Sequence, residues 1–103
     1  MTKGQILKHD FTKGDLRLYN TNGNLTYYET SDGYWYKQEF DTNGNQTYFE
    51  DSYGYWCKCE YDSNHNETYF EDSTGSWQKH EFDTNSNEIY YEDSDGLIRH
   101  SIW

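Results

Sequence analysis

The chain of 103 residues has no proline, and neither alanine nor valine occurs anywhere in it. Aromatic residues take the place of the missing aliphatic ones, with 12 Tyr, 5 Phe and 4 Trp. Aromatic side chains favour a pleated, half-buried surface, and the absence of alanine disfavours helices. The composition therefore predicts an all-β protein.

No long hydrophobic run is present, and the mean hydropathy is −1.31. Disordered chains share such polarity, but they are poor in aromatic residues, so we expect this chain to fold. The first eleven residues have only the pair Ile6 and Leu7 as a hydrophobic stretch, which is too short for a signal peptide or a membrane span. We expect the protein to lie in the cytoplasm, and in the cytoplasm of the host if a phage encodes it.

Cysteine is scarce, because Cys57 and Cys59 are the only two. They stand two residues apart on one face of an expected strand, which is a poor geometry for a mutual disulfide, so we predict free thiols. A zinc site formed by these two cysteines with His80 is an alternative that we disfavour, because no second cysteine pair exists.

A 21-residue repeat fills most of the sequence, with nearly identical blocks at 39–59, 60–80 and 81–101. The same phase extends back to residue 18, so we predict one repeat domain over 1–103, with cap strands in 1–17 and a first repeat at 18–38. Asn-Gly and Asp-Gly pairs between alternating apolar residues predict hairpins. The expected fold is an antiparallel meander of nine or ten strands that forms a single twisted or spiralling sheet.

Acidic residues dominate the repeats, because the three blocks carry net charges of −3, −4 and −5, whereas residues 1–38 carry +1. Alternation along the strands places some of these acids in columns, with lysines 37, 58 and 79 partly neutralising glutamates 39, 60 and 81. We therefore choose the other acidic columns, together with a tryptophan column, as the candidate partner-binding residues. These candidates are Glu29, Glu50, Glu71 and Glu92; Asp51, Asp72 and Asp93; and Trp35, Trp56 and Trp77.

The pattern from Phe40-Asp41 through Asn43-Gly44 to Tyr48 resembles the tyrosine-aspartate (YD) repeats of Rhs and teneurin shells. The resemblance implies a spiral of β-hairpins, without the closed shell, for which four repeats are too few. Small phage and plasmid proteins also have acidic arrays of this style. Because the charge per repeat is comparable with that of duplex DNA, we predict a phage or mobile-element inhibitor that mimics DNA. The expected partner is a basic nucleic-acid-binding protein of host defence, such as a nuclease or CRISPR effector.

Other functions remain open at this point. The Gly33-Tyr34-Trp35-Tyr36 stretch resembles the aromatic repeats of choline-binding modules, which implies binding of carbohydrate or cell wall. The Asp-x-Asn-x-Asn turns at 41–45, 62–66 and 83–87 match the start of a calcium loop, although serine stands where an EF-hand has its glutamate. We expect no enzyme and no cofactor, because a flat meander offers no catalytic cleft, and no direct binding of nucleic acid by so acidic a chain.

The last strand, expected at 97–103, is apolar and lies at a sheet edge, where unpaired backbone groups favour self-association. We therefore predict that the chain can form a homodimer through this strand, and that removal of Ile102 and Trp103 yields monomers.

Overall fold

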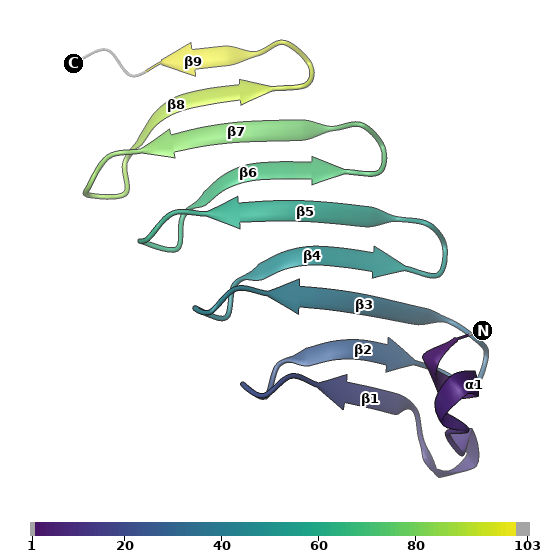
Figure 1. The fold of residues 1–103 in the computed structure, drawn as a ribbon. Helices are drawn as coiled ribbons and strands as arrows, with labels where there is room; N and C mark the ends of the chain where they lie inside the picture. The colour runs from purple at the N-terminus through teal and green to yellow at the C-terminus, as the bar shows by residue number, and fades with distance from the viewer. Residues whose placement is uncertain (1, 101–103) are drawn as a thin grey trace. The chain divides into compact units, whose positions relative to one another are not determined.

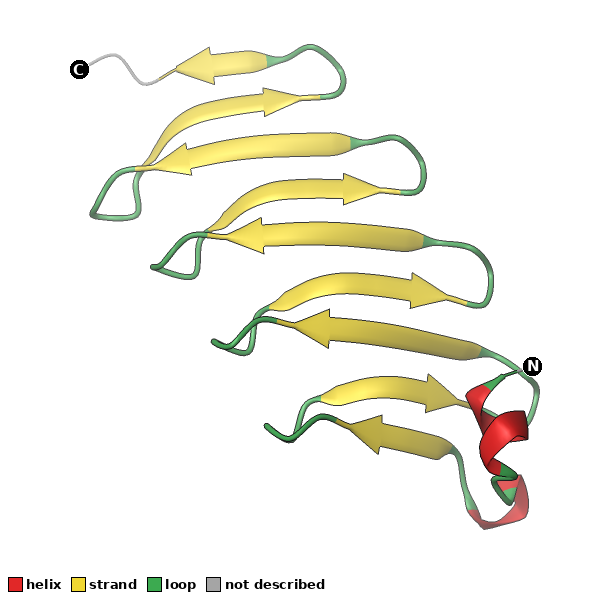
Figure 2. Ribbon diagram, viewed as in Figure 1, coloured by secondary structure: helices red, strands yellow, loops and turns green. Residues whose placement is uncertain are grey.

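The computed structural model describes residues 2–100, and it divides the chain into two compact units, Met1–Tyr55 (unit 1) and Trp56–Trp103 (unit 2). Almost all regular structure is strand (Figure 2), which confirms the prediction of an all-β protein. The boundary between the units falls inside the predicted repeat 39–59, and the single repeat domain stays a prediction.

Unit 1 begins with helical turns and continues as a four-stranded antiparallel meander (Figure 1). Each strand pairs with the strand that follows it in sequence. Its elements are the helix α1 (Lys3–Leu7), the 3-10 turn η1 (Phe11–Lys13), and the strands β1 (Leu16–Tyr19), β2 (Leu25–Glu29), β3 (Trp35–Phe40) and β4 (Gln46–Asp51).

Unit 2 is a five-stranded meander of the same kind, in which each strand again pairs antiparallel with the next. In the part of the chain that the structure describes, neither meander closes on itself, so the predicted meander is confirmed as an open one. The strands are β5 (Trp56–Tyr61), β6 (Glu67–Asp72), β7 (Trp77–Phe82), β8 (Glu88–Asp93) and β9 (Ile98–His100). The residues Ile102 and Trp103, on which the homodimer prediction depends, lie outside the described range.

The turns repeat one hydrogen-bonded design. At the turn after β3, the N–H of Asp41 donates to the carbonyl of Asn45 at 2.9 Å, and the N–H of Gly44 donates to the carbonyl of Asp41 at 3.1 Å. Gly44 has a φ of 83°, a left-handed conformation that glycine adopts without steric cost. In unit 2 the equivalent positions are His65 and Ser86, both with a φ of 66°, so the second unit makes the same turn with residues that disfavour it.

The prediction of cap strands in residues 1–17 was wrong for the segment before β1, which is helical. Thr2 caps α1: its side chain accepts from the N–H of Gln5 at 3.1 Å, and the Gln5 side chain accepts from the N–H of Thr2 at 2.9 Å. This capping box, Thr-x-x-Gln, was visible in the sequence. We did not predict the helix because we judged helix propensity from the composition of the whole chain, which does not describe a five-residue segment.

Very little of the described chain is buried, as expected for a sheet with no second layer across most of its area. The buried side chains are those of Leu16, Tyr27 and Glu29 in unit 1, and of Cys57 and Cys59 in unit 2. Cross-strand pairs of aromatic side chains, which contribute roughly 0.2–1 kcal/mol each, therefore replace much of a conventional core.

Candidate binding faces

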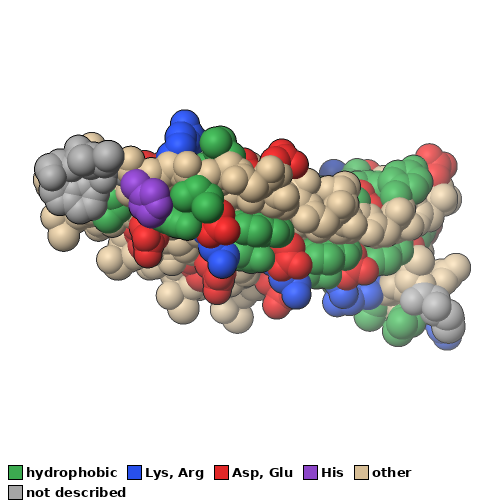
Figure 3. All heavy atoms as spheres, turned by 90° about the horizontal axis from the view of Figure 1, so that it is seen from above, with side chains coloured by type: hydrophobic (Ala, Val, Ile, Leu, Met, Phe, Trp, Pro, Cys, Tyr) green, Lys and Arg blue, Asp and Glu red, His purple; other side chains and the backbone are tan. Residues whose placement is uncertain are grey.

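The strand register of each unit gathers the tryptophans, lysines and most glutamates of the strands on one face, which we call the Trp/Lys/Glu face. In unit 1 it comprises Trp35, Lys37 and Glu39 on β3, Tyr27 and Glu29 on β2, and Tyr48 and Glu50 on β4. In unit 2 it comprises Trp56, Lys58 and Glu60, Tyr69 and Glu71, Trp77, Lys79 and Glu81, and Tyr90 and Glu92. Figure 3 shows acidic and basic side chains next to one another, with hydrophobic side chains between them.

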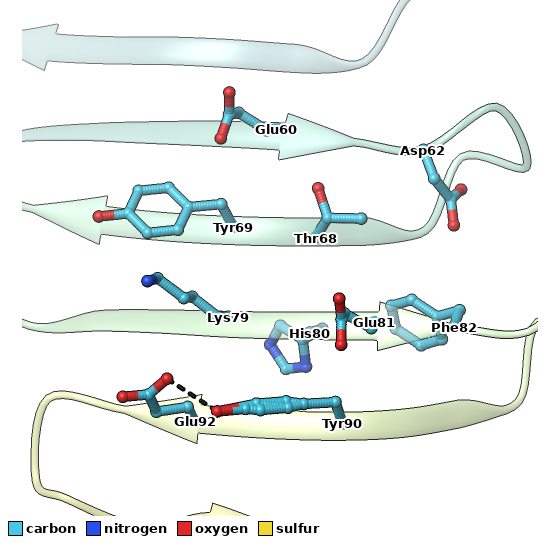
Figure 4. Close-up of a pocket in the computed structure, with 10 residues that line it drawn as sticks. All are labelled: Glu60, Asp62, Thr68, Tyr69, Lys79, His80, Glu81, Phe82, Tyr90 and Glu92. Carbon is cyan, nitrogen blue, oxygen red and sulfur yellow. Dashed lines mark hydrogen bonds between the residues drawn. The ribbon is translucent and has the colours of Figure 1, made fainter.

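A tyrosine and a glutamate two residues later form a hydrogen-bonded pair on this face. The Tyr48 hydroxyl donates to Glu50 Oε1 at 2.9 Å, and this bond, together with Lys37, holds the pKa of Glu50 below its ordinary value. The same donation joins Tyr69 to Glu71 at 3.3 Å and Tyr90 to Glu92 at 2.9 Å (Figure 4). Each glutamate of the predicted column therefore has a tyrosine hydroxyl as a hydrogen-bond donor within its own unit.

The lysines lie opposite this column and not opposite the one that we predicted. Lys37 pairs in register with Glu50, and its ammonium lies 3.3 Å from Glu50 Oε1. Lys58 and Lys79 likewise face Glu71 and Glu92, and their ammonium groups lie 5.4 Å and 5.3 Å from the ring centroids of Trp56 and Trp77. Trp56 and Trp77 thus each hold a lysine ammonium over the ring.

The column that we expected to be neutralised is the exposed one. Glu39, Glu60 and Glu81 are exposed, and their register partners are the tyrosines 48, 69 and 90. Our prediction paired each of these glutamates with the lysine two residues before it on the same strand. The residue across the neighbouring strand decides which charge is neutralised, and it depends on the register, which sequence alone did not give. These three carboxylates are the functional candidates that the sequence reasoning undervalued.

Glu29 is unavailable to a partner, because it is only 2% exposed. Its Oε2 accepts from the Thr2 hydroxyl at 2.7 Å, and its Oε1 accepts from the Gly4 N–H at 2.8 Å and from the Tyr27 hydroxyl at 2.9 Å. Burial opposes ionisation, but these hydrogen bonds outweigh it, so the pKa of Glu29 lies below its ordinary value. Burial and the bond to Glu29 together raise the pKa of Tyr27 to about 12.

The candidate aspartates 51, 72 and 93 hold turns. Asp51 Oδ1 accepts from the N–H groups of Tyr53 and Tyr55, at 2.9 Å and 3.3 Å. Asp93 Oδ1 accepts from two N–H groups in its own turn, and its Oδ2 accepts from the Tyr91 hydroxyl at 2.8 Å, which lowers its pKa. Asp72 Oδ1 accepts from the N–H and from the hydroxyl of Thr74, and the hydroxyl bond contributes most to lowering the pKa of Asp72. These carboxylates therefore stabilise the scaffold first.

The turns that suggested calcium have the same explanation. Asp41 Oδ1 accepts from the N–H groups of Asn43 and Asn45, both at 2.9 Å, and the Asn45 side chain donates to Asp41 Oδ2 at 3.3 Å. Because backbone N–H groups of the turn donate to the aspartate carboxylate, this geometry is an Asx turn. It explains the Asp-x-Asn-x-Asn pattern without a cation. Within residues 2–100 no three His, Cys, Asp or Glu side chains converge as a metal site requires.

An aromatic ladder covers the opposite face of unit 1. The rings of Tyr28 and Tyr36 stack with centroids 5.3 Å apart, and those of Tyr36 and Phe49 stack at 5.5 Å. Tyr34, Tyr53 and Tyr55 extend the ladder through further ring contacts. The rings of Tyr28, Tyr36 and Phe49 cover one another's faces, whereas the Tyr53 ring is 83% exposed, so binding of carbohydrate stays a prediction.

Unit 2 has a hollow on its Trp/Lys/Glu face, with a volume of ≈ 710 Å³ (Figure 4). Tyr69, Tyr90 and Glu92 line it together with Lys79 and Glu81. His80 also contributes, but its ring belongs to the other side of the sheet, where it lies 3.0 Å from Glu88 and stacks on Phe82. The hollow thus combines phenol rings with charges of both signs.

The cysteines form no disulfide, which confirms the prediction of free thiols. Burial, reinforced by Glu67, raises the pKa of Cys59 to about 11, so at neutral pH this thiol is protonated and a poor nucleophile.

No family model matches this chain, and no curated protein is significantly similar to it. The YD-repeat resemblance therefore stays a prediction. No helix in the described part is long and apolar enough to cross a membrane.

Proposed function

We propose that this protein is a non-catalytic acidic binding protein, and that its Trp/Lys/Glu face binds the basic surface of a nucleic-acid-binding protein in place of nucleic acid. The observation that carries the proposal is the exposed pair Glu60 and Glu81 of unit 2, together with Glu39 at the same repeat position in unit 1, whose strand partners are tyrosines and not lysines. Within each unit the hydrogen-bonded hairpins fix the strand positions from which these carboxylates project, which a disordered acidic chain does not do.

Charge density supports a nucleic-acid mimic. A repeat advances two strands, about 9.6 Å, and duplex DNA carries about one phosphate per 1.7 Å, or roughly five to six over that length. The repeat at 60–80 carries a net charge of −4, which is comparable. A basic channel that attracts DNA therefore attracts this surface by the same complementarity.

The partner class that fits is a nuclease or CRISPR effector of host defence, because such proteins hold nucleic acid in basic channels. An inhibitor encoded by a phage or mobile element is the corresponding role for this chain. Two of the tryptophans support this binding mode indirectly, because Trp56 and Trp77 hold lysines next to the acidic side chains of unit 2 and so limit charge repulsion within that face.

The test is capture followed by competition. Proteins of a bacterial lysate that bind heparin are passed over the immobilised chain, and the column is then washed with either a short duplex DNA or uncharged dextran at equal mass. We expect retained proteins to be released by duplex DNA and by raised salt, and to stay bound under dextran. Release by dextran and not by DNA, or retention that salt does not weaken, would overturn the proposal in favour of carbohydrate or apolar binding.

A further inference from the structure

The N-terminal segment shows how a Tyr–Glu pair of this protein is bound when it is covered. Glu29 accepts the Thr2 hydroxyl at 2.7 Å and the Gly4 N–H at 2.8 Å. The Lys3 ammonium lies 5.2 Å from the centroid of the Tyr27 ring, and the Lys3 N–H donates to the Tyr27 hydroxyl oxygen at 3.4 Å. A segment that supplies a hydroxyl, two N–H groups and a cation thus satisfies the pair completely.

Unit 2 repeats the Tyr–Glu pair twice, and no segment of its described residues 56–100 lies upon either pair. In Tyr69–Glu71 and Tyr90–Glu92 the tyrosine hydroxyl donates to Oε1 of the glutamate, as in Tyr27–Glu29. Among residues 2–100 nothing donates to Oε2 of Glu71 or Glu92, which is the atom that Thr2 occupies in Glu29. The hollow of ≈ 710 Å³ lies beside Tyr90 and Glu92, where a covering segment would sit (Figure 4).

We infer that the Tyr90–Glu92 pair and the adjoining hollow bind a lysine-containing Thr-x-Gly segment of the partner protein, as residues 2–4 bind Glu29 in unit 1. The inference rests on the proposed function and names the part of the partner that is recognised. Charge complementarity supports it, because unit 2 has eleven Asp and Glu against three Lys and Arg, a net charge of −8. A basic segment is therefore the occupant that this face favours.

Glycine is a requirement of this mode of binding. A Cβ at Gly4 would lie 2.8 Å from both carboxylate oxygens of Glu29 and 2.7 Å from Phe11 Cζ. The backbone N–H reaches the carboxylate only because no side chain stands between them. The same close approach to Glu92 selects glycine at the third position of the partner segment.

The surroundings of the two pairs differ and so define the rest of the occupant. Leu16 and Leu18 face Glu29 and Tyr27 in register, whereas Lys79 and Glu81 face Glu92 and Tyr90. The N-terminal segment of unit 1 thus meets leucines where a partner on unit 2 meets charges. We therefore expect the bound partner segment to be polar beyond its Thr-x-Gly start.

The experiment uses the whole chain and a synthetic peptide, TKGQILK, that copies residues 2–8. Its matched control is the same peptide with alanine in place of the glycine. Because alanine is the better helix former, weaker binding of this control cannot result from a loss of helicity. Titration is followed by ¹H–¹⁵N chemical shifts of the labelled chain. We expect saturable shifts at Tyr90 and Glu92, and binding at least fivefold weaker for the alanine peptide.

Two variants of the chain complete the test. Glu92→Gln should weaken peptide binding at least fivefold, whereas Glu67→Gln, which removes the same charge beside Cys59, should change it less than twofold. Equal binding of the two peptides, equal effects of the two variants, or shifts confined to Tyr27 and Glu29 would overturn the inference. If the peptide fails while capture and release by duplex DNA succeed, only this inference falls; if the peptide binds and capture fails, the proposed function falls.

Discussion

Unit 1 and unit 2 fold the same hairpin repeat but treat its Trp/Lys/Glu face in opposite ways. In unit 1 the N-terminal segment covers the first Tyr–Glu pair, and Leu16, Tyr27 and Glu29 are buried beneath or beside it. In unit 2 no described segment covers either pair. The difference arises in β1, where Leu16 and Leu18 take the register positions that lysine and glutamate hold in β3, β5 and β7.

The same Tyr–Glu pair stabilises unit 1 where the N-terminal segment lies across it, and we propose that it binds a partner in unit 2. The two units also differ in charge: unit 1 has eight acidic against five basic side chains, and unit 2 has eleven against three. The Tyr–Glu pair is thus covered in unit 1, where leucines face it and a positively charged segment lies across it. Exposure is found where the charge is most negative.

The largest expected effect comes from removing one glutamate from each unit. Glu29→Ala deletes the acceptor of three hydrogen bonds and should lower the local free energy of unfolding of unit 1 by about 3 kcal/mol. Glu92→Ala deletes the acceptor of one and should cost less than about 1 kcal/mol in unit 2. Native-state hydrogen exchange of strand amides measures both, and equal costs would show that the covering contributes nothing.

Gly4→Ala tests the same difference between the units through the helix α1, which contacts Glu29. The added Cβ overlaps Glu29 and Phe11, so we expect a loss of about 1–3 kcal/mol in unit 1 and no change in unit 2. Ile6→Ala is the matched control, because Ile6 is 62% exposed and its loss should be nearly neutral. Urea unfolding combined with exchange at β2 tests this, and a Gly4→Ala variant as stable as Ile6→Ala would contradict the close approach.

Acid should weaken unit 1 through Glu29. Its pKa in the folded state is lowered from the ordinary value of 4.5, so its contribution is fully present above that value and is lost as the pH falls through the folded pKa. The stability difference between wild type and Glu29→Ala should therefore shrink below about pH 4.5. Urea unfolding at several pH values measures it; a constant difference down to pH 2 would argue against the linkage.

The smallest effect concerns the turns. His65→Gly should stabilise unit 2 by up to about 1 kcal/mol, because it removes a side chain from a left-handed residue with a φ of 66°. The reverse change, Gly44→Ser, should destabilise unit 1 by a similar amount, because Gly44 has a φ of 83°. Thermal unfolding of both variants checks the pair, and changes of the same sign would refute the explanation.

The repeat was sufficient to predict the class of fold, the antiparallel meander and the hairpins, because Asn-Gly pairs and alternating aromatics act locally. It was not sufficient for the partners across strands. Lys37 stands two residues from Glu39 in the chain but faces Glu50, since a bulge between Glu39 and Phe40 shifts the register. The burial of Glu29 was equally hidden, because it depends on a contact with Gly4, 25 residues away.

We propose that the positions of the carboxylates, and not the total charge, decide binding of the partner protein. Two triple variants of equal net charge test this on the protein captured by the wild-type chain: Glu39→Gln/Glu60→Gln/Glu81→Gln, and Asp32→Asn/Glu67→Gln/Asp95→Asn. The account predicts that the first variant binds at least tenfold more weakly and the second less than twofold more weakly. Equal losses of affinity for the two variants would contradict it.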